Sequence, residues 1–139
     1  MNRHDDLQPP PGAGGAIAVA APRASPAAML LRSGATFCAL AIVAVLLFNT
    51  RAIGEVPVGH WDKLAHVVCY GSVATLLTIG LGAQRAALAF FITCLAGLAD
   101  EMLQMGVPTR HADLWDLTAD ALAAAVAVLL VRRLARRSG

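Results

Sequence analysis

The residues of this sequence that could carry out chemistry are concentrated in two short stretches. In the first, Asp62, His66 and Tyr70 are spaced four apart, so they share one face of a helix, and Lys63 lies beside them. The second runs from residue 100 to residue 120 and contains Asp100, Glu101, Gln104, Arg110, Asp113, Asp116 and Asp120. Cationic side chains beside carboxylates can transfer protons or bind an anion.

Three of these residues are candidates for catalytic roles. His66 could act as a general base or acid, and Glu101 or Asp116 could orient it. Arg110 could stabilise the charge of a phosphate, because guanidinium pairs with phosphate or carboxylate through two hydrogen bonds. The alternative is structural: Arg110 clamps Asp116 and Glu101 together, and His66 is a neutral side chain satisfied by a neighbouring helix.

The remaining polar residues have different expected roles, which follow from their spacing. Asp62 could cap a helix while Lys63 extends to the headgroups, or both could bind a ligand. Glu101 and Gln104 share a face, whereas Asp100 points elsewhere and is expected to be a boundary or loop-facing charge. Three further aspartates share one face of the next helix: Asp113, Asp116 and Asp120.

A metal site is not expected from the sequence. His66, Glu101 and Asp116 are chemically possible ligands, but no close H-x-x-x-H or E-x-x-H pair supports them. We therefore predict no metal and no cofactor.

The elements that must position these residues are membrane-spanning helices. The chain is 58% hydrophobic and 14% charged, which departs from soluble proteins toward membrane proteins. Four apolar segments follow one another, at residues 34–49 (with flanking residues from Leu30), 64–82, 86–105 and 117–131. Their short connections predict an all-α, polytopic bundle of four antiparallel transmembrane helices within residues 31–139. Residues 1–30, rich in Pro, Gly and Ala, are expected to form a flexible tail.

The distribution of basic residues predicts the orientation. Of the basic residues near the ends of the spans, seven lie on the side of the N and C termini, namely Arg23, Arg32, Arg85, Arg132, Arg133, Arg136 and Arg137. Three basic residues lie on the other side: Arg51, Lys63 and Arg110. Both termini are therefore expected to be cytoplasmic, and the two polar stretches should meet at the outer surface. Asp120, about one turn inside the membrane there, must be protonated, hydrated or paired.

The order of the motifs resembles the VanZ-like family of small integral membrane proteins. The matching runs are D-K-x-x-H-x-x-x-Y (from Asp62), E-x-x-Q (from Glu101) and R-x-x-D-x-x-D (from Arg110), and the resemblance covers roughly residues 36 to 131. It implies a multi-pass protein of the bacterial plasma membrane and a link to teicoplanin resistance. Where the family usually has D-x-x-x-N-x-x-G, this chain has Asp120 and Ala123 in place of the Asn and Gly.

Together these features favour a protein that binds a lipid or a lipid-linked cell-wall component at the outer leaflet and affects glycopeptide susceptibility. Its expected partners are membrane lipids, with a lipid-linked cell-wall precursor or a glycopeptide as further possibilities. The alternatives are an intramembrane enzyme acting on a phosphorylated or glycosylated lipid, and a small proton- or ion-coupled transporter using His66 and Asp120. Nucleic acid is not an expected partner, because the C-terminal arginines are explained as a membrane anchor. The sequence leaves the oligomeric state open.

Overall fold

The computed structural model describes residues 25–49, 60–107 and 113–138, apart from the side chains of His60 and Asp62. The expected flexible tail therefore lies almost wholly outside the described residues. Arg110 and the side chain of Asp62, both predicted to bind a ligand, lie outside them as well.

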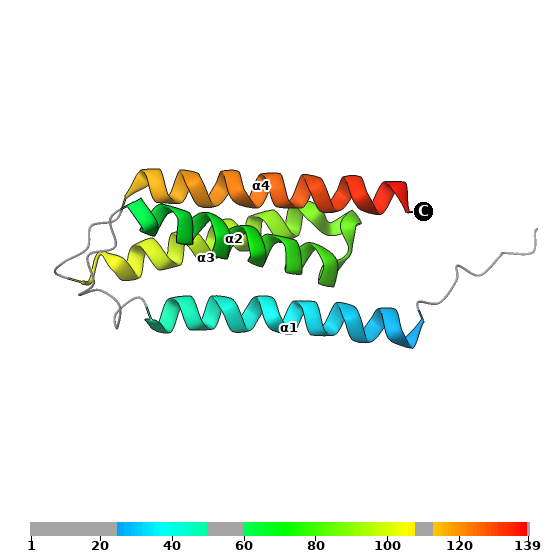
Figure 1. The fold of residues 1–139 in the computed structure, drawn as a ribbon. Coiled ribbons are helices and arrows are strands. Elements are labelled where there is room, and N and C mark those ends of the chain that lie inside the picture. Colours follow the sequence, from blue (N-terminus) through cyan, green and yellow to red (C-terminus); the bar gives the residue numbers. More distant parts are fainter. Residues whose placement is uncertain (1–24, 50–59, 108–112, 139) are drawn as a thin grey trace, which may run out of the picture.

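The predicted four-helix architecture is confirmed. The described chain forms α1 (Pro26–Asn49), α2 (His60–Leu81), a short 3-10 helix η1 (Ala83–Arg85), α3 (Ala86–Gln104) and α4 (Leu114–Arg137). The helix α2 packs against α1, α3 and α4, and α1 runs along one side of the bundle (Figure 1). The start of α1 and the end of α4 lie at the same end of the bundle (Figure 1).

Three of the helices, α1, α2 and α4, begin before the apolar runs from which they were predicted, whereas α3 keeps within its predicted range. α1 begins at Pro26, where proline is favoured in a first turn, and the Ser25 hydroxyl accepts a hydrogen bond from the backbone N–H of Ala28. α2 begins at His60, so Lys63 lies in its first turn. α4 continues to Arg137, since arginine sustains a helix outside the lipid as well as leucine does.

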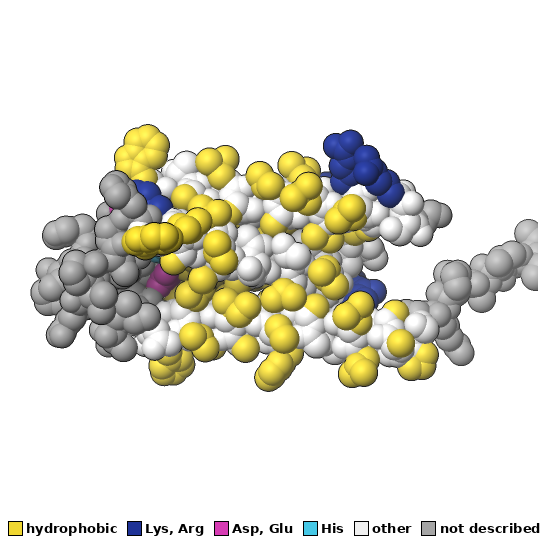
Figure 2. All heavy atoms as spheres, viewed as in Figure 1, with side chains coloured by type: hydrophobic (Ala, Val, Ile, Leu, Met, Phe, Trp, Pro, Cys, Tyr) yellow, Lys and Arg dark blue, Asp and Glu magenta, His cyan; other side chains and the backbone are white. Residues whose placement is uncertain are grey.

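The outer surface of the bundle is apolar on every helix. All four helices are long and apolar enough to cross a membrane. Figure 2 shows hydrophobic side chains along the full length of the visible face, and Lys or Arg side chains at the end that carries the C terminus. Large side chains such as Phe37, Phe91 and Leu129 are more than half exposed, which suits contact with lipid tails.

Small residues line the contacts between helices. Ala39, Ala74, Ala89 and Ala124 are almost fully buried and pack with Val73 and Leu77. Because lipid tails solvate apolar side chains as well as a protein interior does, close backbone approach is what holds such helices together.

The end of α2 opposite its polar start is fixed by Arg32 of α1. Its guanidinium donates to the carbonyl oxygens of Gly80 (3.0 Å) and Leu81 (2.9 Å), which are free at the end of a helix. Gly82 then takes a left-handed φ of 92° and turns the chain into η1. This tie holds the start of α1 against the end of α2.

Candidate functional site

The buried ionisable side chains of the described residues, together with Gln104, gather at one end of the bundle, where α2 and α4 begin and α3 ends. We call this the polar end. It contains His66 and Tyr70 from α2, Asp100, Glu101 and Gln104 from α3, and Asp116 and Asp120 from α4, each at most 6% exposed. The expectation that the two polar stretches of the sequence meet in space is therefore confirmed for these residues.

The outermost layer of the polar end is a network around Lys63. The ammonium Nζ lies 2.9 Å from Oδ2 of Asp113 and 2.6 Å from Oδ1 of Asp116. Asp113 also caps α4, since its Oδ1 accepts a hydrogen bond from the backbone N–H of Trp115 at 2.9 Å. That N–H and the Lys63 ammonium lower the pKa of Asp113 below its ordinary value. Lys63 and Asp113 are about half exposed, and Asp116 is buried beneath them.

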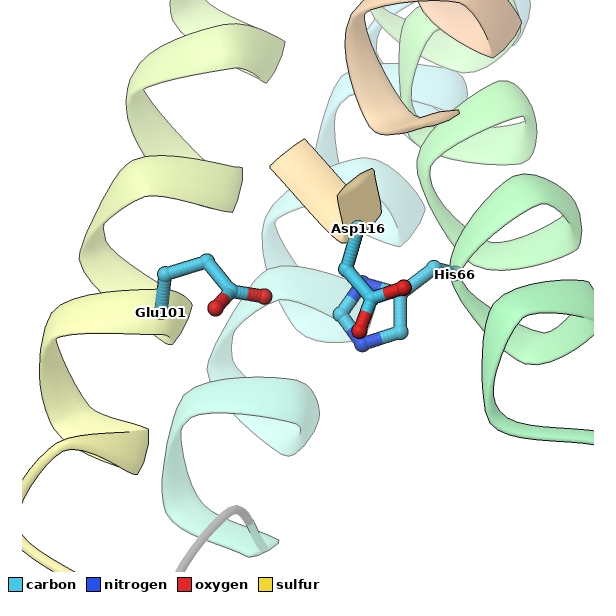
Figure 3. A group of neighbouring side chains, drawn as sticks. All are labelled: His66, Glu101 and Asp116. Carbon is cyan, nitrogen blue, oxygen red and sulfur yellow. The ribbon is translucent and has the colours of Figure 1, made fainter. Parts of the chain in front are cut away.

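The middle layer brings together one side chain from each of three helices. His66, Glu101 and Asp116 each offer a ligand atom, and these atoms all lie within 4.8 Å of one another. Figure 3 shows the Glu101 carboxyl group extending from α3 toward Asp116 and the His66 ring. Glu101 Oε2 accepts the backbone N–H of Asp113 at 2.9 Å, whereas Oε1 is buried with no hydrogen-bond partner among the described residues. Among the described residues, these three are the group that could hold a metal.

The deepest layer is a histidine–carboxylate pair. His66 Nδ1 lies 3.2 Å from Oδ1 and 3.3 Å from Oδ2 of Asp120, which is 1% exposed. The His66 ring also stacks on Tyr70, with centroids 5.7 Å apart. The carboxylate that contacts Nδ1 is therefore Asp120, whereas the sequence suggested Glu101 or Asp116 for that role.

Gly97 makes room for this pair. A methyl group at position 97 would lie 2.9 Å from Oδ2 of Asp120, so only glycine lets α3 approach α4 at this depth. On α2, Gly71 faces Ala123 with ordinary contact room, at 3.8 Å between the Ala123 methyl and a methyl placed on Gly71. The glycine expected on α4 from the family resemblance is thus matched by a glycine across the interface on α2.

The expectation for Asp100 is wrong. It is 5% exposed and faces the bundle interior, where its Oδ2 accepts hydrogen bonds from the Tyr70 hydroxyl at 3.1 Å and from Gln104 Nε2 at 3.4 Å. The inward face of α3 is wide enough to include positions 97, 100, 101 and 104, since three helices surround it. One feature of the sequence indicates that Asp100 faces inward: it precedes Gln104 by four residues, which places both on one face of the helix.

An apolar groove runs from the polar end along the lipid-facing side of α2 and α4. Its volume is about 860 Å³, and its lining includes Val67, Gly71 and Thr75 from α2 and Ala119, Ala123 and Ala127 from α4. Val67 directly follows His66, and Ala119 directly precedes Asp120. The groove therefore begins at the depth of His66 and Asp120, although neither of these side chains lines it.

Comparison with known proteins agrees with this arrangement. The VanZ/LLP1 family matches residues 17–136, which include α1, α2, α3 and all of α4 except its last residue. No curated protein and no solved structure matches the chain. Apart from Arg110 and the Asp62 side chain, the residues of the motifs that suggested a VanZ-like protein all lie at the polar end, which also contains Asp100 and Asp120. This chain belongs to the VanZ/LLP1 family.

Proposed function

We propose that this protein binds a phosphate-bearing lipid or lipid-linked cell-wall component in the outer leaflet of the bacterial plasma membrane. The lipid chain would lie in the groove between α2 and α4, and the headgroup would meet Lys63. The observation that carries the proposal is that the apolar groove begins at Val67, one turn along α2 from Lys63, so an apolar chain in the groove could reach a headgroup at Lys63. A ligand with one apolar and one anionic part fits that combination.

Lys63 supplies the contact with the anion. An ammonium group has three N–H donors, and Asp113 and Asp116 accept two of them. The third has no acceptor among the described residues and could donate to an oxygen of the headgroup, to which the half-exposed side chain is accessible. Trp61 and Trp115, each 74% exposed, flank this level of the bundle, and tryptophan favours the membrane–water interface. Lys63 would therefore lie at headgroup depth.

The groove supplies selectivity for the chain of the lipid. From Val67 to Leu76 it extends over nine residues of helix, or roughly 14 Å. Its volume of about 860 Å³ falls within the range of small-molecule sites, roughly 300–1,000 Å³. Because a lipid chain is equally well solvated by bulk lipid, the groove would discriminate by shape, and the headgroup contacts would provide most of the affinity.

The predicted orientation and the family resemblance connect this site to glycopeptides. With cytoplasmic termini, the polar end faces outward, where a lipid-linked cell-wall precursor would be bound. Sequestering such a lipid, or masking it from a membrane-anchored glycopeptide, would lower susceptibility to teicoplanin.

The binding proposal is tested with the purified full-length protein and three lipids. Native mass spectrometry would compare a polyprenyl phosphate, phosphatidylglycerol and uncharged diacylglycerol. We expect both phosphate lipids to be retained and diacylglycerol to be lost. Lys63→Gln should weaken retention of the phosphate lipids roughly tenfold, the equivalent of about 1.4 kcal/mol for one charged hydrogen bond. Arg133→Gln, at the other end of the bundle, removes the same charge far from the proposed site; it is the matched control and should weaken retention much less than Lys63→Gln does.

A second pair of variants tests the groove. Ala123→Leu fills the groove and should reduce retention of the bulky polyprenyl chain, whereas Ala41→Leu, on the exposed face of α1, should not. Equal retention of all three lipids by every variant would contradict the proposal. A preference for phosphatidylglycerol over polyprenyl phosphate would support a general phospholipid rather than a cell-wall intermediate.

A second candidate function is favoured by the His66–Asp120 pair. A carboxylate on Nδ1 fixes the ring and stabilises its protonated form, as a general base requires. In that case the protein would be an intramembrane enzyme acting on the same lipid, with His66 moving the proton. Product formation from a phosphorylated or glycosylated lipid that stops in His66→Ala, with lipid retention unchanged, would favour the enzyme over the binding protein.

A further inference from the structure

The middle layer of the polar end has the composition of a metal site. His66, Glu101 and Asp116 come from α2, α3 and α4, and one ligand atom from each lies within 4.8 Å of the others (Figure 3). Each residue is at most 6% exposed. One imidazole nitrogen and two carboxylate oxygens are ligands that Zn²⁺ accepts in proteins.

Two further observations point to a bound cation. First, Glu101 Oε1 is buried without a hydrogen-bond partner among the described residues, although Glu101 is 4% exposed. A buried carboxylate oxygen without a donor is costly, and a metal would satisfy it. Second, four carboxylates are buried at this end: Asp100, Glu101, Asp116 and Asp120. The ammonium of Lys63, half exposed above them, contacts only Asp116 of these four in the described part of the chain.

Each of the three residues is also held by a second contact that leaves a metal-binding geometry possible. His66 Nδ1 faces Asp120, as in the carboxylate–histidine–metal arrangements that fix an imidazole for ligation through Nε2. Glu101 Oε2 accepts the Asp113 N–H. Lys63 contacts Oδ1 of Asp116, so a metal bound through Oδ2 need not break that ion pair.

We propose that His66, Glu101 and Asp116 bind one divalent transition-metal ion, with Zn²⁺ as the preferred ion. Zn²⁺ binds nitrogen and oxygen ligands more tightly than Mn²⁺ or Fe²⁺ does. Three protein ligands leave a fourth position for water or a phosphate oxygen. The absence of a close ligand pair in the sequence does not count against the site, because each ligand comes from a different helix. The proposal does not depend on lipid binding.

Metal content tests the site directly. Full-length protein without an affinity tag of histidines would be purified in detergent, treated with a chelator and titrated with Zn²⁺ in a calorimeter. We expect one ion per chain. Glu101→Gln and Asp116→Asn preserve size and should each weaken binding at least 100-fold, and His66→Ala should abolish it. Asp120→Asn should weaken it by about 10–100-fold, the usual effect of losing the partner of a ligating histidine.

The matched control removes every other histidine. The variant with His4→Ala, His60→Ala and His111→Ala keeps only His66 and should bind one Zn²⁺ with unchanged affinity. Substitution with Co²⁺ should give visible absorption bands that His66→Ala removes. Helicity by circular dichroism would establish that each variant is folded.

Two outcomes would overturn the proposal. One is wild-type protein that binds no Zn²⁺ after chelation and titration. The other is stoichiometric binding that survives in folded His66→Ala and is lost in the variant retaining only His66. Retention of the phosphate lipids in the presence of chelator would leave the proposed function standing while the metal test fails.

Discussion

At the scale of single residues, the most informative position is Asp120. The family resemblance leads us to expect asparagine there, and this chain places an acid against His66 Nδ1. An asparagine oxygen could accept the same hydrogen bond, so the contact can survive without the charge. The acid adds a negative charge at a site that is 1% exposed. That charge would stabilise a protonated or metal-bound histidine.

We predict that Asp120→Asn and Asp120→Ala separate these roles. Asp120→Asn should keep the thermal unfolding midpoint in detergent within a few degrees of the parent, because the hydrogen bond to His66 remains. Asp120→Ala should destabilise the protein by about 1–3 kcal/mol, because it leaves a buried ring nitrogen without this partner and creates a cavity. Equal stability of Asp120→Ala and the parent would show that the pair does not hold α2 to α4. If Asp120→Asn also retains cellular function, the acid performs no chemistry.

The hydrogen bond from the Trp115 N–H and the contact with the Lys63 ammonium predict that the stabilisation contributed by Asp113 depends on pH. The folded state lowers the pKa of Asp113 below its ordinary value of 3.8, so the carboxylate form is favoured by folding. The resulting stabilisation is complete above pH 3.8 and is lost as the pH falls through the lower, folded value. We therefore expect the parent to unfold at a slightly higher temperature than Asp113→Asn at pH 6, and the gap to close in acid. A gap that widened on acidification would contradict the assigned direction.

At the scale of elements, the contact between α3 and α4 is set by Gly97. Its neighbour across the interface is the Asp120 side chain, so helix spacing and the position of the carboxylate depend on one another. Gly34 of α1, by comparison, lies in open space, where an added methyl would meet no heavy atom of another element within 4 Å. The two glycines therefore offer a matched pair.

We predict that Gly97→Ala destabilises the bundle by about 1–3 kcal/mol, because the added methyl must displace Asp120 or separate α3 from α4. Gly34→Ala should be neutral or slightly stabilising, since alanine favours a helix more than glycine does. Unfolding by increasing denaturing detergent, followed by circular dichroism, would measure both. The prediction fails if the two substitutions have equal effects.

At the scale of the whole molecule, the bundle has two different ends. One carries the buried polar cluster, and the other carries the arginines in the last turns of α4 together with Arg32. The basic residues near the helix ends predict that the arginine end is cytoplasmic. The polar end can bind a lipid of the outer leaflet only if the protein has this orientation.

Labelling of single cysteines tests that orientation. In a background where Cys38, Cys69 and Cys94 are replaced by alanine, Asp113→Cys should react with a membrane-impermeant maleimide on intact cells. Ser138→Cys should react only after the cells are opened. The reverse pattern would place the polar end in the cytoplasm and remove the outer-leaflet function.

The sequence by itself determined the architecture and most of the candidate residues. Four apolar runs with short connections allow few arrangements in lipid, because every backbone group must be satisfied within a helix. Antiparallel neighbours then bring the start of α2, the end of α3 and the start of α4 to one end of the bundle. For that reason His66, Glu101 and Asp116 could be grouped although 50 positions separate the first from the last.

Only the tertiary structure decided which atoms face one another. Helical spacing fixes which residues share a face, but the rotation of each helix about its axis follows from packing between small residues such as Gly71, Ala123 and Gly97. That rotation turns Asp100 inward to Tyr70, pairs His66 with Asp120, and leaves Glu101 Oε1 buried beside two other possible metal ligands. None of these contacts joins residues of a single helix, so no local pattern could specify them.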